Sequence, residues 1–303
     1  MTESEKHSPL GTQELRERIN ERLQQLVSGG NSGHKLSAPI RYALLAPGKR
    51  LRPLICLISA QCLGGRVQHA VDPACALEMI HTASLIIDDL PCMDDAQMRR
   101  GQLTCHRRFG EATAILVAFE LLSRGYRVIN EAPGLSPEMR IGLLKVLTGA
   151  VGVDGLIGGQ ERDLAADREQ NADKGRVMNI HEMKTGALFI AAAETGGIVA
   201  GLKDDQLAPV REFAGRFGLA YQTLDDLLDV QATSGAAGKD VRNDVDKATL
   251  VGVLGVDAAT EYANNMIVAA MEALQPLGRD MRPLENFIQS TIDHAADMRR
   301  TVN

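Results

Sequence analysis

The stretch that decides the fold is SLIIDDLPCMDD, which runs from Ser84 to Asp95. A second stretch, LAYQTLDDLLD from Leu219 to Asp229, repeats its arrangement, since in both an aspartate cluster interrupts an apolar helical pattern. Carboxylates this dense repel one another and are costly to remove from water unless cations compensate them. We therefore expect the two clusters to face each other across a helical cavity and to form a cage for hard cations, which also hold the phosphates of a substrate.

The second cluster is the more regular of the two. Asp225 and Asp229 are four residues apart, so they share one face of a helix, and Asp226 lies beside them. The usual alternative for such a charge run is a solvated helix surface. The apolar residues on both sides of this cluster predict burial instead, which favours a functional site.

The first cluster continues into a basic segment. Pro91 disturbs the helix soon after Asp88, which allows Asp94 to converge with Asp88 on the same ions. Arg99 and Arg100 follow, and guanidinium groups bind phosphate oxygens through paired hydrogen bonds. Paired arginines alone are more often surface charge. Their position next to the acidic cluster indicates that a Mg²⁺–diphosphate complex lies between the two.

Composition points to an all-helical, soluble protein. Of the 303 residues, 45% are hydrophobic and only 3% aromatic, and runs of β-branched residues are short. The formal net charge of −6 argues against a general nucleic-acid binder. The five cysteines form no CxxC pair, and the polar N-terminus resembles neither a signal nor a transit peptide, so we expect a cytoplasmic location. We also expect no membrane span, because no apolar run approaches the required length.

Periodicity and breakers predict one all-α domain over residues 1–303, a helical bundle, with a loose N-terminal arm up to about Thr12. One helix should start at Ser136, a good N-cap that is followed by Pro137 at the first helical position. The expected helices cover residues 13–27, 37–45, 51–63, 73–90, 112–131, 136–155, 181–201, 206–230, 260–274 and 282–300.

Several further polar residues are weak signals by themselves. The segment GKRLRP, from Gly48 to Pro53, opens a helix whose end favours an anion, although it lacks the spacing of a nucleotide-binding loop. His81 precedes the first aspartate cluster by two helical turns, but a lone histidine is usually structural. Lys184 with Thr185, and Lys239 in the later GKD segment, add polar groups that an ordinary protein surface would also carry.

With these motifs in place, the chain resembles the trans-isoprenyl diphosphate synthase family from about Pro47 to its C-terminal helix. The order and rough spacing of six motifs carry the resemblance: GKRLRP (48–53), DDLPCMD (88–94), RRG (99–101), KTG (184–186), YQTLDDLLD (221–229) and GKD (238–240). The stretches LAPGKRLRP, HTASLIIDDLPCMDDAQMRRG and KATLVGVLG are most similar to bacterial geranylgeranyl diphosphate synthases of carotenoid pathways. The resemblance implies the isoprenoid-synthase type of helical bundle, with a central substrate cavity.

The resemblance also implies a prenyl transfer in which Mg²⁺ ions, three per active site, hold an allylic diphosphate. The metal site would consist of Asp88, Asp89, Asp94, Asp225, Asp226 and Asp229. Arg99 and Lys239 would bind the allylic diphosphate, and Lys49, Arg52, His81 and Arg100 would bind isopentenyl diphosphate. Lys184, Thr185 and Gln222 would line the path of the carbocation and also belong to the substrate-binding set. The catalytic residues would be Arg99, Lys184, Thr185 and Gln222. Proton loss to the released diphosphate would end each condensation. A homodimer is the state that the family implies.

Product length in this family depends on the residue five positions before the first aspartate, where a bulky side chain closes the product tunnel. Ala83 occupies that position here and Ser84 follows, which implies an open tunnel and a C20 product, geranylgeranyl diphosphate. Side chains between Ile115 and Leu122 could restore a floor. The chain departs from the family in the same region, where AFEL (118–121) replaces the common GDAL and removes one acidic position.

Four alternatives remain at this stage. A farnesyl diphosphate synthase would differ only in tunnel depth and would make a C15 product. A non-catalytic partner subunit would be expected to lose an aspartate motif, and both motifs are intact here. A class I terpene cyclase would carry a second motif of Asn/Ser/Glu type and more aromatic residues. A purely structural bundle explains neither aspartate cluster.

Overall fold

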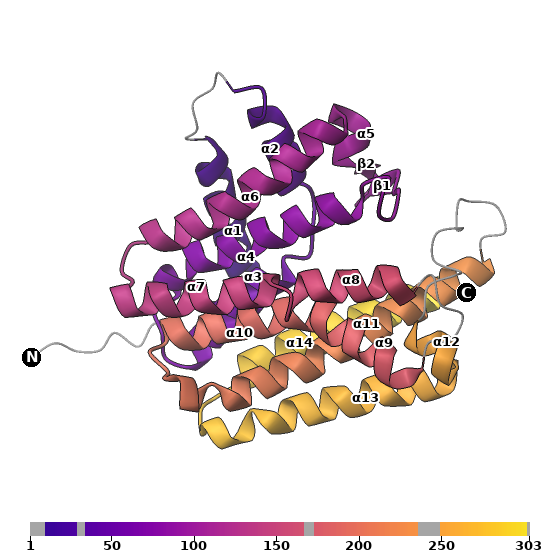
Figure 1. Cartoon of the computed structure of the whole chain (residues 1–303). Helices are drawn as coiled ribbons and strands as arrows, with labels where there is room; N and C mark the ends of the chain where they lie inside the picture. The colour runs from indigo at the N-terminus through magenta and orange to yellow at the C-terminus, as the bar shows by residue number, and fades with distance from the viewer. Residues whose placement is uncertain (1–9, 29–33, 167–172, 236–248, 302–303) are drawn as a thin grey trace, which may run out of the picture.

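The computed structural model of this chain describes residues 10–28, 34–166, 173–235 and 249–301, and Figure 1 shows how they are arranged. The helices of the first half are α1 (Thr12–Ser28), α2 (Ser37–Leu44), α3 (Leu51–Cys62), α4 (Val67–Asp88), α5 (Cys105–Phe109), α6 (Glu111–Glu131) and α7 (Pro137–Val151). Those of the second half are α8 (Leu156–Ala166), α9 (Lys174–His181), α10 (Ala187–Val199), α11 (Ala208–Gly235), α12 (Leu250–Leu254), α13 (Val256–Ala273) and α14 (Arg282–Thr301). Shorter elements are strands β1 (Met98–Arg99) and β2 (Gln102–Leu103), the π-helical turn η1 (Glu182–Gly186), and the 3₁₀ turns η2 (Asp204–Gln206) and η3 (Gln275–Leu277).

The helices pack in a continuous series through the molecule. In this series α6 packs on α4, α4 on α3, α3 on α10, α10 on α11, and α11 on α13 (Figure 1). Helices α3, α4 and α10 occupy its middle, and most of their residues are buried, as expected for helices that are apolar around their circumference. The predicted all-α bundle is thereby confirmed.

Several helix boundaries differ from those expected. Helix α4 begins at Val67 rather than at residue 73, because Pro73 is accommodated inside the helix, where it is buried among other core residues. Helix α13 begins at Val256, directly after Gly255, whose φ of 79° ends the short helix before it. Helix α7 ends at Val151 because the Gly152–Gly155 turn follows.

Helices α8 and α9 were not expected from the sequence. Helix α8 contains two adjacent glycines near its start, and each glycine lowers intrinsic helix propensity by about 1 kcal/mol relative to alanine. Gly158 and Gly159 are buried where α8 packs closely against η1, and a Cβ atom on Gly159 would lie only 2.5 Å from the backbone nitrogen of Lys184. Tertiary packing, rather than local pattern, therefore determines this helix.

Two helical stretches do reach membrane-spanning length and apolar composition, Val67–Asp88 and Pro137–Ala166, so the expectation that none would is wrong in that respect. The apolar window of the first is 72% buried inside the protein, as in the core helix of a soluble protein. The second consists of α7 and α8, which are separate helices with a turn between them. Two such stretches are weak evidence for a membrane span.

The expected N-terminal arm falls mostly on residues 1–9, which lie outside the described residues. Leu10 already belongs to the packed structure, because its backbone N–H donates to Oε1 of Gln61 over 2.8 Å and its side chain contacts the core. Helix α1 begins at Thr12, at the point where the arm was expected to end.

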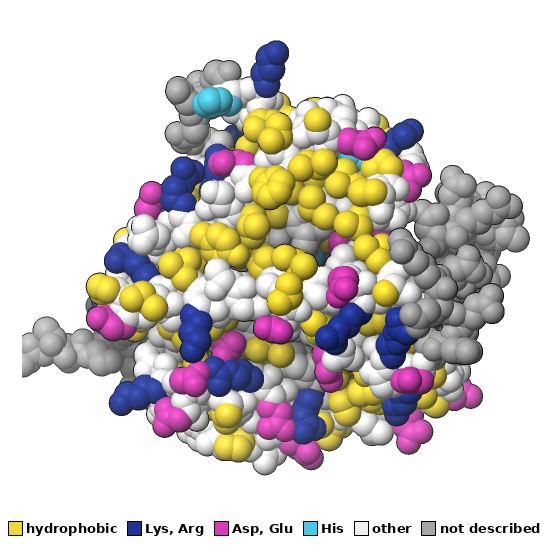
Figure 2. Space-filling view, in the orientation of Figure 1, with side chains coloured by type: hydrophobic (Ala, Val, Ile, Leu, Met, Phe, Trp, Pro, Cys, Tyr) yellow, Lys and Arg dark blue, Asp and Glu magenta, His cyan; other side chains and the backbone are white. Residues whose placement is uncertain are grey.

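Apolar side chains gather on the outer face formed by α6 and the helices beside it (Figure 2). We call this surface the α6 patch and define it by Ile115, Leu116, Phe119, Ile141 and Ile157, all of which are exposed. Phe119 retains 66% of its accessible surface and Ile141 68%, values that are unusual for large apolar residues. Exposed apolar surface of this kind marks interaction sites or ligand grooves.

Candidate active site

Helix α4 presents one polar face to a cavity of about 480 Å³ near its C-terminal end. Glu78, His81, Leu85 and Asp88 line this cavity at spacings of three or four residues, which places them along one side of the helix. The second acidic motif reaches the same cavity from α11 through Asp225. The fold therefore brings the two motifs together, as their sequence pattern predicted.

The chain turns back on itself directly after α4. The backbone N–H of Asp94 donates to the carbonyl of Asp88 over 3.0 Å, and the next N–H, of Asp95, donates to the carbonyl of Leu90. This reversal contains Pro91, and it brings Asp94 to the same cavity as Asp88. The break in the helix that Pro91 predicted therefore allows the two carboxylates to converge.

Asp88 is a carboxylate whose charged form is disfavoured by its surroundings. Burial raises its pKa to about 6; the charge of Lys184 opposes the rise and that of Asp94 adds to it. Asp226, on α11, has its pKa raised to about 7, again mainly by burial. A nearby cation would stabilise the charged form of such carboxyl groups, and groups with raised pKa values concentrate at functional sites.

The remaining aspartates of the two motifs differ in exposure. Asp225 and Asp229 are exposed, whereas Asp89 and Asp226 are buried, with 3% and 6% of their surface accessible. Asp89 accepts a hydrogen bond from Nε of Arg99 over 2.6 Å, in an ion pair behind the cavity. The cavity wall is therefore formed by Asp88, Asp94 and Asp225, with the two buried carboxylates set back from it.

The arrangement of these carboxylates fits Mg²⁺, although not as a closed protein cage. Among the described residues, no group of three or more His, Cys, Asp or Glu side chains is close enough to hold an ion by itself. Mg²⁺ typically uses one or two carboxylates together with water and substrate phosphate oxygens. Asp88, Asp94 and Asp225, which all line the cavity, suit ions that are shared with a bound diphosphate.

A short β-hairpin positions the paired arginines. Strands β1 and β2 pair Met98 with Leu103 and Arg99 with Gln102, and the turn between them consists of Arg100 (φ 53°) and Gly101 (φ 78°). Two consecutive positive φ angles are typical of a tight type I′ hairpin turn, in which glycine is favoured. As a result both arginines line the cavity, a geometry that the pattern RRG alone did not predict.

A buried carboxylate, Glu78, organises the cationic side of the cavity. Nη1 of Arg50 lies 2.5 Å from Oε1 of Glu78, and Nη1 of Arg100 lies 3.9 Å from the same oxygen. Arg50 is itself buried and also donates to Oδ1 of Asn20 and to the carbonyl of Ala46. Arg50 is therefore a structural partner of Glu78, whereas the side chain of Arg100, 27% exposed, remains available to a ligand.

His81 and Arg52 form the second part of this cationic side. Nη1 of Arg52 lies 3.2 Å from Nε2 of His81, and because a guanidinium group only donates, this nitrogen of His81 must accept. Burial and the charge of Arg52 hold the pKa of His81 well below its usual range, so the ring is neutral and carries its proton on Nδ1. Burial also lowers the pKa of Arg52, to about 10. Lys49, which is exposed, lies 5.9 Å from the centre of the Tyr221 ring.

The π-helical turn η1 supplies the polar residues between the two sides. Lys184 donates to Oδ2 of Asp163 over 2.6 Å, and Thr185 donates through Oγ1 to Oε1 of Gln222 over 2.8 Å. Single π-helical turns are rare and occur frequently at functional sites. The turn directs Lys184 and Thr185 into the same cavity as Gln222 on α11.

An apolar cavity of about 420 Å³ adjoins the polar one, and the two share Ser84, Asp88, Leu156 and Gln160 in their walls. Ala83 and Ser84 line the apolar cavity, as the product-length interpretation requires. Most of the other wall residues are apolar, among them Ile80, Ile87, Ala118, Phe119 and Leu122, and Glu161 is a charged exception. The segment from Ile115 to Leu122 could supply a floor to the product tunnel, and three of its residues, Ala118, Phe119 and Leu122, line the cavity wall.

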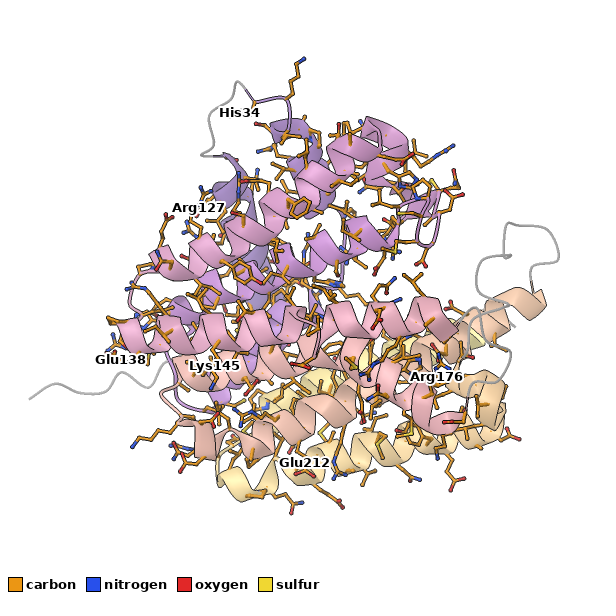
Figure 3. The ribbon with its side chains drawn as sticks, viewed as in Figure 1. His34, Arg127, Glu138, Lys145, Arg176 and Glu212 are labelled. Carbon is orange, nitrogen blue, oxygen red and sulfur yellow. The ribbon has the colours of Figure 1, made fainter. Side chains whose placement is uncertain are left out.

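A larger cavity, of about 810 Å³, lies away from these motifs between α7, α10 and α11. Glu138 and Lys145 of α7, both labelled in Figure 3, belong to its rim. It contains neither aspartate motif nor any residue of the GKRLRP and RRG segments. Size alone is therefore a poor guide here, and the arrangement of charges identifies the site.

All of the site residues that the sequence singled out, except Lys239, lie within the described residues. Lys239 and its GKD segment lie outside the described residues. Glu78 and Asp163 were missed, although the position of Glu78, three residues before His81 on the same helix face, was a usable signal. No sequence signal pointed to Asp163, because it belongs to the unexpected helix α8.

An acidic side, a cationic side and an adjoining apolar cavity in a helical bundle define a prenyltransferase of the isoprenoid-synthase type. The chain belongs to the Polyprenyl synthetase family, which it matches over residues 34–291. It is 39% identical to the geranylgeranyl diphosphate synthase of Pantoea ananas over 277 residues, which cover 91% of this chain and 90% of that protein. The family resemblance drawn from the motifs is thereby confirmed.

Two further relatives carry different names. A dimethylallyltranstransferase of Fischerella ambigua is 37% identical over 287 residues, which cover 94% of this chain and 83% of that protein. An FPP/GFPP synthase from Zymomonas mobilis has a similar structure, with a TM-score of 0.83 and 29% identity over 92% of this chain and 96% of the other. The family and fold are therefore common to enzymes whose names indicate different products.

Proposed function

We propose that this protein condenses isopentenyl diphosphate with allylic diphosphates in the cytoplasm and that its main product is geranylgeranyl diphosphate. The observation that carries the proposal is the polar cavity lined by both carboxylates and guanidinium groups, which meets an apolar cavity at Asp88 and Ser84. A diphosphate is anionic and a prenyl chain is apolar, so this pair of cavities suits one substrate that has both parts.

The allylic diphosphate would be held through Mg²⁺ by Asp88, Asp94 and Asp225 of the cavity wall. Asp229, which is exposed one helical turn after Asp225 and does not line the cavity, would join them once a diphosphate is bound. Bound there, Mg²⁺ would stabilise the negative charge of the departing diphosphate. Asp89 would keep Arg99 oriented toward the same group, and Asp226, which the family resemblance assigned to the metal site, is set back from the cavity wall. Lys184 would add positive charge beside Asp88.

The cationic side would bind isopentenyl diphosphate directly, without a metal ion. Lys49, Arg52 and Arg100 provide permanent positive charge, and neutral His81 can donate from Nδ1. Isopentenyl diphosphate keeps its diphosphate during the condensation, so direct contacts without a metal ion suit it. The allylic substrate loses its diphosphate, so Mg²⁺ suits that group. The two sides therefore have different tasks in one condensation.

The product chain would grow into the apolar cavity. The small side chains of Ala83 and Ser84 leave its upper wall open, and Ile80, eight residues before Asp88, is the most distant α4 residue in the wall. At a rise of about 1.5 Å per residue, this corresponds to roughly 12 Å along the helix axis. A C20 product is favoured by the small residues Ala83 and Ser84 in the cavity wall and by the relatives named as geranylgeranyl diphosphate synthases.

A homodimer is part of the proposal. The α6 patch is exposed on a single chain, and large exposed apolar surfaces of soluble proteins are commonly covered by a partner. Its residue Phe119 also belongs to the apolar cavity wall, so association would cover that wall as well.

The test is an incubation of the purified protein with isopentenyl diphosphate, Mg²⁺ and each allylic starter, followed by dephosphorylation and chromatographic sizing of the alcohols. A dominant C20 alcohol supports the whole proposal. A C15 alcohol retains the reaction and makes the protein a farnesyl diphosphate synthase. The absence of condensation in a folded, Mg²⁺-supplied sample would overturn the proposal in favour of a non-catalytic partner subunit.

A further inference from the structure

A chain of hydrogen bonds runs from the cavity wall into the protein. Thr185 donates through Oγ1 to Oε1 of Gln222 over 2.8 Å, and Nε2 of Gln222 donates to Oδ1 of Asp226 over 2.9 Å. Thr185 and Gln222 line the cavity, whereas Asp226 does not. The chain therefore connects a polar surface that faces substrate with a carboxylate that is 6% exposed.

The direction of this chain is determined by its inner end. A carboxylate only accepts hydrogen bonds, so the amide of Gln222 must turn its NH₂ group toward Asp226 and its oxygen toward Thr185. A protonated Asp226 would still offer a carbonyl oxygen for the same bond. The only hydroxyl proton of Thr185 is consequently committed to Gln222, and the lone pairs of its oxygen are left for the cavity.

The surroundings of Asp226 keep it in this position. Gln222 lies one helical turn before it on α11, and the backbone of Leu250 also hydrogen-bonds to Asp226. Nε2 of His181 lies 3.7 Å from Oδ2 of Asp226, which is too far for a hydrogen bond, and burial lowers the pKa of His181 to about 4, so the ring is neutral. His181 is buried and directly precedes η1, the turn that carries Thr185. Asp226 therefore lies between α11 and the segment that leads into η1, the two elements whose side chains meet in the hydrogen-bond chain.

We propose that Asp226 is a positioning residue rather than a metal-binding one, and that it orients Gln222 so that Thr185 presents oxygen lone pairs to positive charge on the allylic carbon. The inference rests on the proposed function. A fixed dipole aimed at developing charge needs no reorganisation during the reaction, which is why such groups are effective in enclosed sites. Neighbouring aspartates of one motif then have separate tasks, with Asp225 at the cavity and Asp226 behind it.

The first test compares Asp226→Asn with Asp225→Asn. An asparagine side chain in place of Asp226 keeps an oxygen but adds an NH₂ group, so the orientation of Gln222 is no longer enforced. We expect kcat to fall about tenfold in Asp226→Asn, while the Kd of Mg²⁺ with inorganic diphosphate, measured by calorimetry, stays close to that of the wild type. Asp225→Asn should weaken that binding clearly. Equal weakening in both variants would overturn the proposal, because it would identify Asp226 as a metal-binding residue.

The second test is a double-mutant cycle between Thr185→Val and Asp226→Asn. No hydrogen bond joins these two residues directly, so unconnected effects on kcat would multiply. If Asp226 acts through Gln222 on Thr185, then Asp226→Asn should have little further effect once the hydroxyl is absent. If the two losses in kcat multiply in full, the proposed chain of hydrogen bonds is contradicted.

Gln222→Leu supplies a variant that leaves both ends of the chain in place. It should reproduce the loss in kcat and make Asp226→Asn nearly silent, and thermal unfolding of every variant controls for folding. A full further loss from Asp226→Asn in the Gln222→Leu background would contradict the chain in the same way. A wild-type protein with no condensation activity would instead remove the proposed function, so the two failures are distinguishable.

Discussion

The backbone N–H of Asp94 donates to the carbonyl of Asp88 over 3.0 Å, and this bond folds the first acidic motif back onto the end of α4. Without it, the side chains would continue along separate directions after Pro91. With it, both carboxylates reach one cavity, which Asp225 of the second motif also lines. The local backbone geometry thus converts a linear motif into one wall of a site.

Replacement of a cavity-facing aspartate should remove activity and leave the fold intact. We expect Asp88→Asn and Asp225→Asn each to lower kcat by at least about 100-fold, because each removes a carboxylate that faces the ions. The matched control is Asp95→Asn, since Asp95 is exposed and its φ of 45° suits asparagine. Steady-state kinetics and circular dichroism test the prediction, which fails if Asp88→Asn retains near-complete activity.

The pKa of Asp88 predicts how stability depends on pH. Burial raises its pKa in the folded protein to about 6 from 3.8, so between these values the folded state binds more protons than the unfolded state. This group therefore destabilises the metal-free protein progressively as pH rises through that window, and fully above it.

The test of this relationship is Asp88→Asn in the metal-free protein. It should leave the free energy of unfolding unchanged near pH 4 and raise it at pH 8, by at most about 3 kcal/mol. Urea unfolding at the two pH values measures the difference. Asp205→Asn, at an exposed position, is the control and should show no such pH-dependent gain. An equal effect of Asp88→Asn at both pH values would contradict the assigned pKa.

Product length should respond to Ala83. This residue is 6% exposed and lines the apolar cavity, so Ala83→Tyr should fill its upper part and shift the main product from C20 to C15 or shorter. Ser123→Tyr is the control, because Ser123 is an exposed residue of α6 that does not line the cavity. Chromatography of the dephosphorylated products provides the measurement. Unchanged product length in Ala83→Tyr would mean that another residue closes the cavity.

Arg50 and Arg100 contact the same carboxylate but should behave differently. Arg50→Ala removes the close partner of buried Glu78 and leaves only the 3.9 Å contact with Arg100, so it should lower the free energy of unfolding by about 3 kcal/mol. Arg100→Ala retains the Arg50–Glu78 pair, so it should preserve stability and raise the KM of isopentenyl diphosphate. Urea unfolding and steady-state kinetics separate the two effects. The same stability loss in both variants would show that Glu78 depends equally on each arginine.

Two glycines provide a matched test of the contact between α8 and η1. A Cβ atom on Gly159 would lie 2.5 Å from the backbone nitrogen of Lys184, whereas one on Gly149, in α7, would meet nothing within 4 Å. Gly159→Ala should therefore displace η1 and lower both stability and kcat. Gly149→Ala should be neutral or stabilising by up to about 1 kcal/mol. Activity assays and thermal unfolding compare them, and equal behaviour would argue against close packing at η1.

The acidic and basic motifs were predictable from sequence because their chemistry is local. Asp225 and Asp226 stand out in an apolar helix, and helical spacing alone places Asp225 and Asp229 on one face. The break at Pro91 likewise predicted that Asp94 could join Asp88. Such conclusions need only the periodicity of a helix and the energetics of buried charge.

Other features depended on contacts between residues far apart in the chain. Helix α8 carries two glycines and no strong helical signal, and it forms because Gly159 allows close packing on η1. Arg50 and Arg52 look equivalent in sequence, yet one is paired with Glu78 and the other meets His81. No local pattern distinguishes the two.

The sequence by itself determined the fold class, the family and most of the charged residues that line the polar cavity, because each follows from short-range pattern. Only the tertiary structure decided which carboxylates face the cavity, as the contrast between Asp225 and Asp226 illustrates. The physical reason is that burial and hydrogen-bond partners are properties of packing. Adjacent residues of one helix point in different directions, and their neighbours come from elements that lie far away in the chain.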